Sequence, residues 1–154
     1  MPSDEEWYLA SLGTPDKEAD WQGSDCQVSS NWAAQPGLTG SGENCVSAYG
    51  AFDMIGNVWE WVKGEADGGV FKGKSLPLSG YVTAVDSQGV PVATDIEMAD
   101  PNFNKDYFWL KEKDIRGLAR GGYWDNKSDA GVYAMYLVSP PDFAGTGVGF
   151  RCAK

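Results

Sequence analysis

The side chains that could carry out chemistry in this chain are limited by the absence of histidine. Without imidazole, the chain lacks the commonest general base, the usual transition-metal ligand and the side chain that titrates near neutral pH. Three cysteines are present, Cys26, Cys45 and Cys152, and no two of them have the C-x-x-C spacing of a zinc or thioredoxin-like centre. Any reaction proposed for this chain must therefore proceed without imidazole.

The sequence leaves the pairing of these cysteines open. Cys26 and Cys45 lie in one polar, loop-like segment, so a single disulfide can form between them. The alternative is three free thiols, with Cys152 buried in a terminal strand. An odd number of cysteines excludes a fully paired framework.

The charge balance excludes several classes of partner. Twelve basic residues stand against twenty-two acidic ones, which gives a net charge of −10. Such a surface repels phosphate backbones and anionic lipid, so we expect no nucleic acid as a partner. We also expect no membrane insertion, because no apolar run is long enough to cross a bilayer. Residues 1–6 have neither the basic nor the apolar part of a secretion signal.

The length and composition predict one globular domain over residues 1–154, loop-rich and pinned by aromatic anchors. The chain has seven tryptophans and twenty glycines but few long periodic segments. Ser3 and Glu6 have the spacing of a capping box, so we expect one short helix from there to a stop at Gly13.

The remaining elements are predicted from turn signals and alternation. Residues 14–50 should form an ordered loop held by Trp21 and Trp32, and a strand should follow a turn at 53–56. Residues 80–94 should form a hairpin with Pro91 on an edge strand. We expect a short helical turn at 107–111 and further strands at 118–124, 131–138 and 148–153, the first of them entering a tight turn. A helix followed by late strands indicates an α+β fold with a small antiparallel sheet.

Three segments resemble the formylglycine-generating-enzyme (sulfatase-modifying factor) superfamily. They are residues 2–7 (PSDEEW), residues 49–62 (YGAFDMIGNVWEWV), and the pair of RGG at 120–122 with GFRC at 149–152. They occur in the family's order and span nearly the whole chain. The resemblance implies a C-type-lectin-like fold with little regular secondary structure, in a shortened version that lacks the upstream half of such domains.

The resemblance does not extend to the catalytic residues. In the active enzymes two cysteines follow the Arg-Gly-Gly turn and bind copper, whereas residues 123–133 here contain none. The related iron-dependent sulfoxide synthases need histidine ligands, which this chain lacks, and other side chains do not replace thiolate or imidazole. We therefore expect no catalytic activity. An oxidoreductase of the formylglycine-generating type is the alternative.

A second branch of the superfamily is a closer match: the variable proteins of diversity-generating retroelements. In these proteins mutagenesis of adenines randomises Asn-type codons between the Arg-Gly-Gly turn and the Gly-Phe-Arg-Cys strand, here a variable region at about 120–152. Every residue type at the positions expected to vary can be reached from an Asn codon by changing its first two bases. These ligand-binding positions are Tyr123, Asp125, Asn126, Asp129, Tyr136, Val138, Ser139, Phe143, Gly145 and Gly147.

Such a surface needs exposed variable residues over a buried framework. Alternation along 132–138 predicts that Tyr133, Met135 and Leu137 face the core and that Tyr136 and Val138 face the other side. Tyr123, Tyr136 and Phe143 are the expected aromatic anchors of binding, and partly buried packing is the alternative role. The expected polar contacts come from four residues that could instead cap their own turns: Asp125, Asn126, Asp129 and Ser139.

The superfamily also implies a structural calcium site in the D-x-x-G-N-x-W-E segment. Its ligands would be the carboxylates of Asp53 and Glu60 and the main-chain carbonyls of Gly56 and Val58. The alternative is that Asp53 caps its own turn and Glu60 pairs with an arginine such as Arg120 or Arg151. No other cofactor is expected, and the sequence Trp124-Asp125-Asn126 lacks the partner motif of calcium-mediated sugar binding.

The resemblance thus predicts a non-catalytic ligand- or receptor-binding protein whose C-terminal surface is diversified by a retroelement. Its partner would be a protein or surface ligand, and its location a virus particle or cell surface. A structural virion or surface domain, whose loops contact only neighbouring subunits, is a further alternative.

Overall fold

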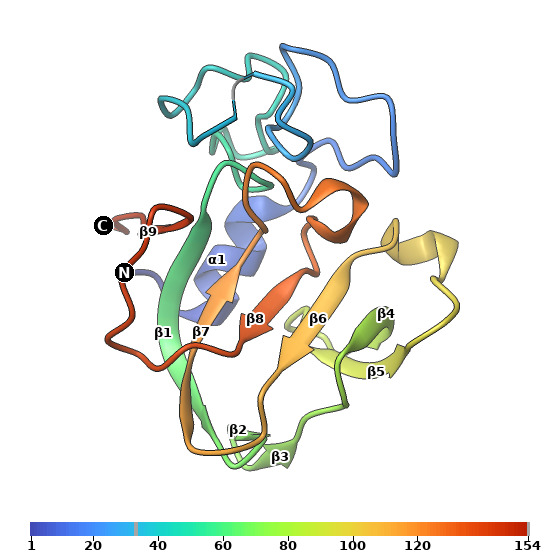
Figure 1. The fold of residues 1–154 in the computed structure, drawn as a ribbon, viewed down its shortest axis with the longest axis vertical. Helices are drawn as coiled ribbons and strands as arrows, with labels where there is room; N and C mark the ends of the chain where they lie inside the picture. Colours follow the sequence, from blue (N-terminus) through green and yellow to red (C-terminus); the bar gives the residue numbers. More distant parts are fainter. Residues whose placement is uncertain (33, 154) are drawn as a thin grey trace.

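The computed structural model describes residues 1–32 and 34–153, and in them one α-helix, two 3-10 helices and nine strands (Figure 1). In chain order these elements are α1 (Asp4–Ser11), β1 (Trp59–Asp67), β2 (Val70–Phe71), β3 (Lys74–Ser75), β4 (Gly80–Val85), β5 (Pro91–Asp95), η1 (Pro101–Phe103), β6 (Tyr107–Leu110), β7 (Ile115–Arg120), η2 (Lys127–Asp129), β8 (Met135–Leu137) and β9 (Val148–Phe150). This arrangement confirms the α+β class. Within the described ranges, no helix is long and apolar enough to cross a membrane.

The strands form one curled sheet in the order β3-β2-β1-β7-β8-β6-β4-β5, and β9 pairs with the start of β1. Most neighbours are antiparallel, but β1 with β9 and β6 with β8 are parallel. The sheet is therefore mixed, and larger than the small antiparallel sheet expected from the sequence. Parallel pairs join segments that are far apart in the chain, so no local turn signal predicts them.

The helix α1 begins where the capping box predicts. The Ser3 hydroxyl accepts a hydrogen bond from the Glu6 N–H at 3.2 Å, and the Glu6 carboxylate accepts one from the Ser3 N–H at 2.7 Å. Trp7 is fully buried, and the helix packs against β1 (Figure 1). Gly13 follows the helix with a φ of 78°, and a Cβ there would lie 2.8 Å from that of Ala48. Glycine is therefore required at this stop.

The predicted hairpin at 80–94 is confirmed. The prediction of a helical turn at 107–111 is wrong. Strands β4 and β5 pair antiparallel, and β5, which begins at Pro91, ends the sheet. Residues 107–110 form β6, which pairs with β4 on one side and β8 on the other. Phe108 is fully buried in β6, so long-range pairing and burial outweigh the local mixture of polar and aromatic residues. The strands predicted at 131–138 and 148–153 are confirmed but shorter.

A disulfide between Cys26 and Cys45 closes the loop region at 14–50. Cys45 is fully buried, and Trp21 packs half-buried against the apolar cluster around the disulfide. Cys152 is free and exposed, so the alternative with three free thiols and a buried Cys152 is wrong. The single bridge stabilises this loop by restricting the unfolded chain.

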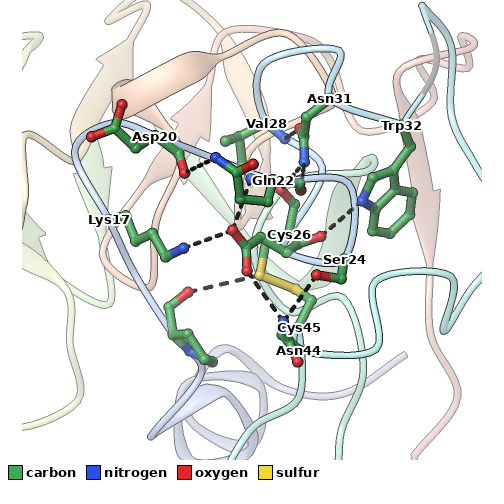
Figure 2. A network of polar contacts seen from close by, with 12 residues as sticks. Lys17, Asp20, Gln22, Ser24, Cys26, Val28, Asn31, Trp32, Asn44 and Cys45 are labelled. Carbon is green, nitrogen blue, oxygen red and sulfur yellow. Dashed lines mark hydrogen bonds and ion pairs between the residues drawn. A yellow bond between two sulfur atoms is a disulfide. The ribbon is translucent and has the colours of Figure 1, made fainter.

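Polar contacts order the same loop, and Lys17, Gln22 and Trp32 in Figure 2 all take part in them by binding Asp25. Its carboxylate accepts hydrogen bonds from the Lys17 ammonium at 2.6 Å and the Gln22 N–H at 2.8 Å. These contacts, the one from Lys17 above all, hold the pKa of Asp25 below its ordinary value. The Trp32 indole N–H donates to the Asp25 carbonyl at 2.8 Å, which confirms Trp32 as an anchor of this loop. The described residues of this segment, 14–32 and 34–50, are thus ordered without a helix or a sheet strand.

A fully buried ion pair joins the first helix to the middle of the sheet. The Arg120 Nε donates to the Asp4 carboxylate at 2.7 Å, and both side chains are 0% exposed. The same guanidinium donates to the Gly89 carbonyl at 3.0 Å and lies over the Trp7 ring at 5.8 Å. One side chain therefore connects α1, β7 and the turn of the β4–β5 hairpin.

Two interacting aspartates support the turn that leads into β8. The Asp106 carboxylate is fully buried and accepts from the Tyr133 N–H at 2.7 Å, and that of Asp16 accepts from the Val132 N–H at 3.4 Å. Burial raises the pKa of Asp16 to about 7. Burial and the nearby Asp16 charge raise the pKa of Asp106 well above its ordinary value. The pair therefore retains a proton at a pH where exposed aspartates are ionised.

Replacing Asp4 with alanine leaves the Arg120 charge buried without its partner. We expect D4A to lower the free energy of unfolding by about 3–5 kcal/mol, measured by urea denaturation. The control is E5A on the exposed side of the same helix, with an expected change within about 0.5 kcal/mol. Equal losses in the two variants would contradict a special role for the buried pair.

The aspartate pair makes stability fall as the pH rises. The folded state holds a proton up to about pH 7 that the unfolded state loses near pH 4, so the stabilisation is present at low pH and lost across this window. Each unit of pKa shift corresponds to about 1.4 kcal/mol. We expect the free energy of unfolding to be larger at about pH 5 than at about pH 8, and D16N to flatten this dependence. Because the chain has no histidine, few other groups titrate between pH 5 and pH 8. If the stability of D16N depended on pH in the same way as that of the unmodified chain, the pH dependence would not come from Asp16.

Candidate binding site

The candidate site begins at the turn that follows β7. Gly121 and Gly122 have φ values of 90° and 93°, a region that other residues rarely adopt. A Cβ on Gly121 would lie 2.6 Å from the Met54 carbonyl oxygen, and one on Gly122 would lie 2.4 Å from the Ala130 Cβ. The tight turn predicted here is confirmed. It directs the next two residues, Tyr123 and Trp124, toward the surface.

Hydrogen bonds from the loops hold the backbone beyond this turn. The Trp124 N–H donates to the Asn57 carbonyl at 3.1 Å, and the Trp124 carbonyl accepts from the Ser30 N–H at 2.7 Å. The Gly56 N–H donates to the Gly121 carbonyl at 3.0 Å. The segment before β1 and the segment after β7 are thus fixed to each other.

An open pocket of about 440 Å³ lies between β1, β8 and the two segments that follow β7 and β8. Aromatic side chains make most of its lining, and small residues of the loop before β9 complete it. The lining residues are Trp59, Trp61, Tyr123, Trp124, Tyr136, Phe143, Gly145, Thr146, Gly147 and Val148. This is an apolar recess with the dimensions of a ligand-binding site.

The rings around the pocket pack against one another. Trp59 lies 5.4 Å from Tyr136 and 5.3 Å from Trp109 between ring centroids, and Tyr123 lies 4.8 Å from Trp124. The Tyr136 and Ser139 hydroxyls are 2.9 Å apart and share a hydrogen bond. Because of these contacts, the walls of the pocket are ordered before a ligand binds. Such pre-organisation lowers the entropy cost of binding.

The structure brings together half of the positions expected to vary. Five of them line the pocket: Tyr123, Tyr136, Phe143, Gly145 and Gly147. Phe143 and Gly145 are exposed, and the others in this group are half-buried. Alternation also divides β8 as expected, since Met135 and Leu137 are fully buried and Tyr136 is not. Tyr133 was expected to face the core, but its side chain is only half-buried, so this prediction is confirmed in part.

The other five positions lie outside the pocket. Asp125 is exposed, whereas Val138 is half-buried. Burial raises the pKa of Asp129. Asn126 accepts a hydrogen bond from the Tyr123 N–H at 2.8 Å, which is the turn-capping role given as the alternative. The expected exposure is wrong for Ser139, which is 8% exposed because its hydroxyl turns inward to Tyr136.

Five pocket residues were not among the predicted site residues, and two of them, Trp59 and Trp61, belong to β1. These two lie two positions apart in β1, so both side chains point to the same face of the sheet. A strand with the pattern W-E-W, ahead of an aromatic C-terminal region, was the signal that could have found them. The sequence alone does not show which of the two faces of this strand lies against the variable region.

The residues predicted to bind calcium are arranged differently from a metal site. Glu60 accepts hydrogen bonds from Arg151 and from the Trp7 indole, both at 2.6 Å, which leaves its oxygens engaged. Asp53 accepts from the Gly40 N–H at 2.6 Å, and burial raises the pKa of Asp53. Calcium needs six to eight oxygen ligands. Among the described residues there is no group of three or more His, Cys, Asp or Glu side chains suited to a metal.

For Glu60 the arrangement is the arginine pair given as the alternative, with Arg151 as the partner. Asp53 contacts a neighbouring loop and does not cap its own turn. Gly56 and Val58, whose carbonyls complete the predicted set, lie in the segment just before β1. The four residues do not fit a calcium ion while Glu60 is paired in this way. Calcium binding there stays a prediction.

Comparison with known proteins places the chain in a family. No curated protein matches the sequence significantly. The family model described as the sulfatase-modifying factor enzyme 1-like domain matches residues 1–154, the full length of the chain. Together with the single helix, the curled mixed sheet and the long loops, this match supports the C-type-lectin-like fold. The chain therefore belongs to the family of sulfatase-modifying factor enzyme 1-like domains.

Proposed function

We propose that this family member is a non-catalytic binding protein. It contacts a protein or surface ligand through the aromatic pocket and through the surrounding surface of residues 120–152. We further propose that a retroelement diversifies this surface. The observation that carries the proposal is the clustering of five positions expected to vary around one pocket. These positions come from three separate parts of the C-terminal region, and nothing in their spacing requires them to meet.

The burial pattern supports a division between framework and binding surface. Met135 and Leu137, which belong to the expected framework, are fully buried. Asp125 and Phe143, which belong to the expected variable set, are exposed. A substitution at an exposed position usually changes stability little. Such a fold can therefore keep its shape while its binding surface changes.

The positions of the cysteines argue against the oxidoreductase alternative. Cys26 and Cys45 are joined in a disulfide, far from the Gly121-Gly122 turn in sequence. The free thiol of Cys152 lies in another recess, beside Glu6 and Arg151. No cysteine follows the turn at the place where the active enzymes have two. The disulfide also suits an oxidising environment, as a virus particle or cell surface would provide.

The division between framework and surface can be tested through stability. We expect F143A to change the free energy of unfolding by no more than about 0.5 kcal/mol, because Phe143 is 46% exposed. We expect L137A to lower it by about 2–5 kcal/mol, because Leu137 is fully buried. Urea denaturation measures both. A loss for F143A as large as that for L137A would place Phe143 in the framework and contradict the division.

The binding role can be tested by display of a library randomised at Tyr123, Asp125, Tyr136 and Phe143. Selection against a panel of proteins should enrich binders, and replacing a selected aromatic anchor with alanine should cost about 2 kcal/mol of binding energy. The control library randomises four exposed residues that do not line the pocket: Leu78, Val92, Ile96 and Met98.

Equal enrichment from both libraries would contradict a dedicated binding surface. The unmodified chain should also be incubated with copper and a cysteine-containing peptide. Oxidation of that peptide would contradict the non-catalytic role and support the oxidoreductase alternative. The absence of oxidation together with enrichment from the first library alone is the result that the proposal expects.

A further inference from the structure

The pocket contains aromatic rings of two kinds. Three belong to positions that the proposed diversification leaves unchanged, and three belong to positions that it changes. The unchanged rings are Trp59, Trp61 and Trp124, and the changeable ones are Tyr123, Tyr136 and Phe143. The pocket therefore keeps an aromatic part whatever residues occupy the variable positions. We therefore expect the constant tryptophans to bind a chemical group that different partners have in common.

The surroundings of the pocket are acidic, while its lining is uncharged. None of the described residues that line it carries a charge. Asp125 follows Trp124 directly and Asp142 precedes Phe143, and both aspartates are exposed. Residues 121–147 contain three acidic residues and one basic residue, Lys127, within a chain of net charge −10. Acidic residues thus outnumber basic ones in the segments that adjoin the pocket, and such a charge balance favours a cation over an anion as ligand.

Aromatic faces bind cations through the negative side of the ring quadrupole. The described part of the chain contains three such contacts, two of them on tryptophan rings. The Arg120 guanidinium lies over the Trp7 ring at 5.8 Å, and the Lys17 ammonium lies over the Trp21 ring at 5.7 Å. Arginine suits such a pocket better than lysine because its planar, weakly hydrated guanidinium stacks on aromatic faces.

The lining is less suited to a sugar or to a neutral aliphatic group. A sugar needs several hydrogen-bond donors and acceptors around its ring. The side-chain acceptors in this lining are the hydroxyls of Thr146, Tyr123 and Tyr136, because the tryptophan indole N–H groups only donate. The Tyr136 hydroxyl already bonds to Ser139. A neutral aliphatic group would fill the pocket but gain nothing from the acidic surroundings. These features leave an organic cation as the best-matched ligand.

We propose that the aromatic pocket holds the guanidinium of an arginine side chain that projects from the protein partner. This inference rests on the proposed binding function and adds the chemistry of the group that is recognised. Of the constant tryptophans, Trp61 and Trp124 are half-buried and provide the stacking surface, while Trp59 is buried and packs against Tyr136. The neighbouring aspartates provide the attraction. The variable residues then select among partners that present such an arginine.

The test compares N-acetyl-arginine amide with N-acetyl-citrulline amide, which has nearly the same shape and no charge. We expect the arginine compound to shift the NMR signals of the pocket residues saturably, with a Kd of about 1 mM, as suits so small a ligand. The citrulline compound should bind roughly tenfold more weakly because it lacks the cation–π contact. Added salt should weaken the arginine compound more than the citrulline compound.

Matched variants locate the binding. F143A should weaken the arginine compound about fivefold by removing one ring of the pocket. F150A is the control, because Phe150 is an exposed aromatic residue that does not line the pocket. D142N should weaken binding about twofold at low salt, through the lost attraction alone. All three residues are exposed, so the variants are expected to fold.

Three results would overturn the inference. They are equal affinity for the arginine and citrulline compounds, equal loss in F143A and F150A, and saturable binding of a methyl glucoside without binding of the arginine compound. If one of these occurs while the display library still enriches binders that depend on Tyr123 or Tyr136, only the arginine inference fails. If neither library enriches binders, the proposed function itself fails.

Discussion

The burial of one guanidinium in the middle of the molecule constrains the rest of the structure. A buried charge is tolerated only when it is paired and hydrogen-bonded, and Arg120 finds its partner in Asp4 at 2.7 Å. Asp4 opens α1, and Arg120 ends β7 directly before the turn that leads to the pocket. The Gly89 carbonyl brings the β4–β5 hairpin to the same group. One charged group therefore connects the helix, the hairpin and the strand that leads to the site.

A second charged pair, Glu60 with Arg151, supports the pocket from the opposite face of β1. Trp59 and Trp61 face the pocket, so Glu60 between them faces the other way, where it meets Trp7 and Arg151. Arg151 directly follows β9, and β9 pairs in parallel with β1 along the pocket residue Val148. The pair thus fastens the end of the chain to the strand that carries the tryptophans. The pocket stays apolar because its charged supports lie on the opposite face.

The parts of this structure that the sequence predicts are those set by neighbouring residues. The Ser3–Glu6 capping box, the hairpin and the Gly121-Gly122 turn depend on short-range hydrogen bonds and on backbone angles that glycine alone adopts easily. The strand at 107–110 was missed because its identity comes from pairing with β4 and β8, which lie far away in the chain. The Cys26–Cys45 bridge remained one of two alternatives for the same reason. Trp59 and Trp61 were placed in a strand, but only the fold shows which face meets Tyr136.

The same distinction bears on which positions can change freely under the proposed function. Tyr123 and Phe143 contribute their side chains to the pocket, and Asp125 contributes to the open surface beside it. Asn126 and Ser139 also have structural roles, because one caps the backbone at Tyr123 and the other orients the Tyr136 hydroxyl. A substitution at either removes a hydrogen bond from the framework, with a typical cost of about 1 kcal/mol. Variation without loss of stability is therefore greatest at the rim of the pocket and smaller at the residues that shape its walls.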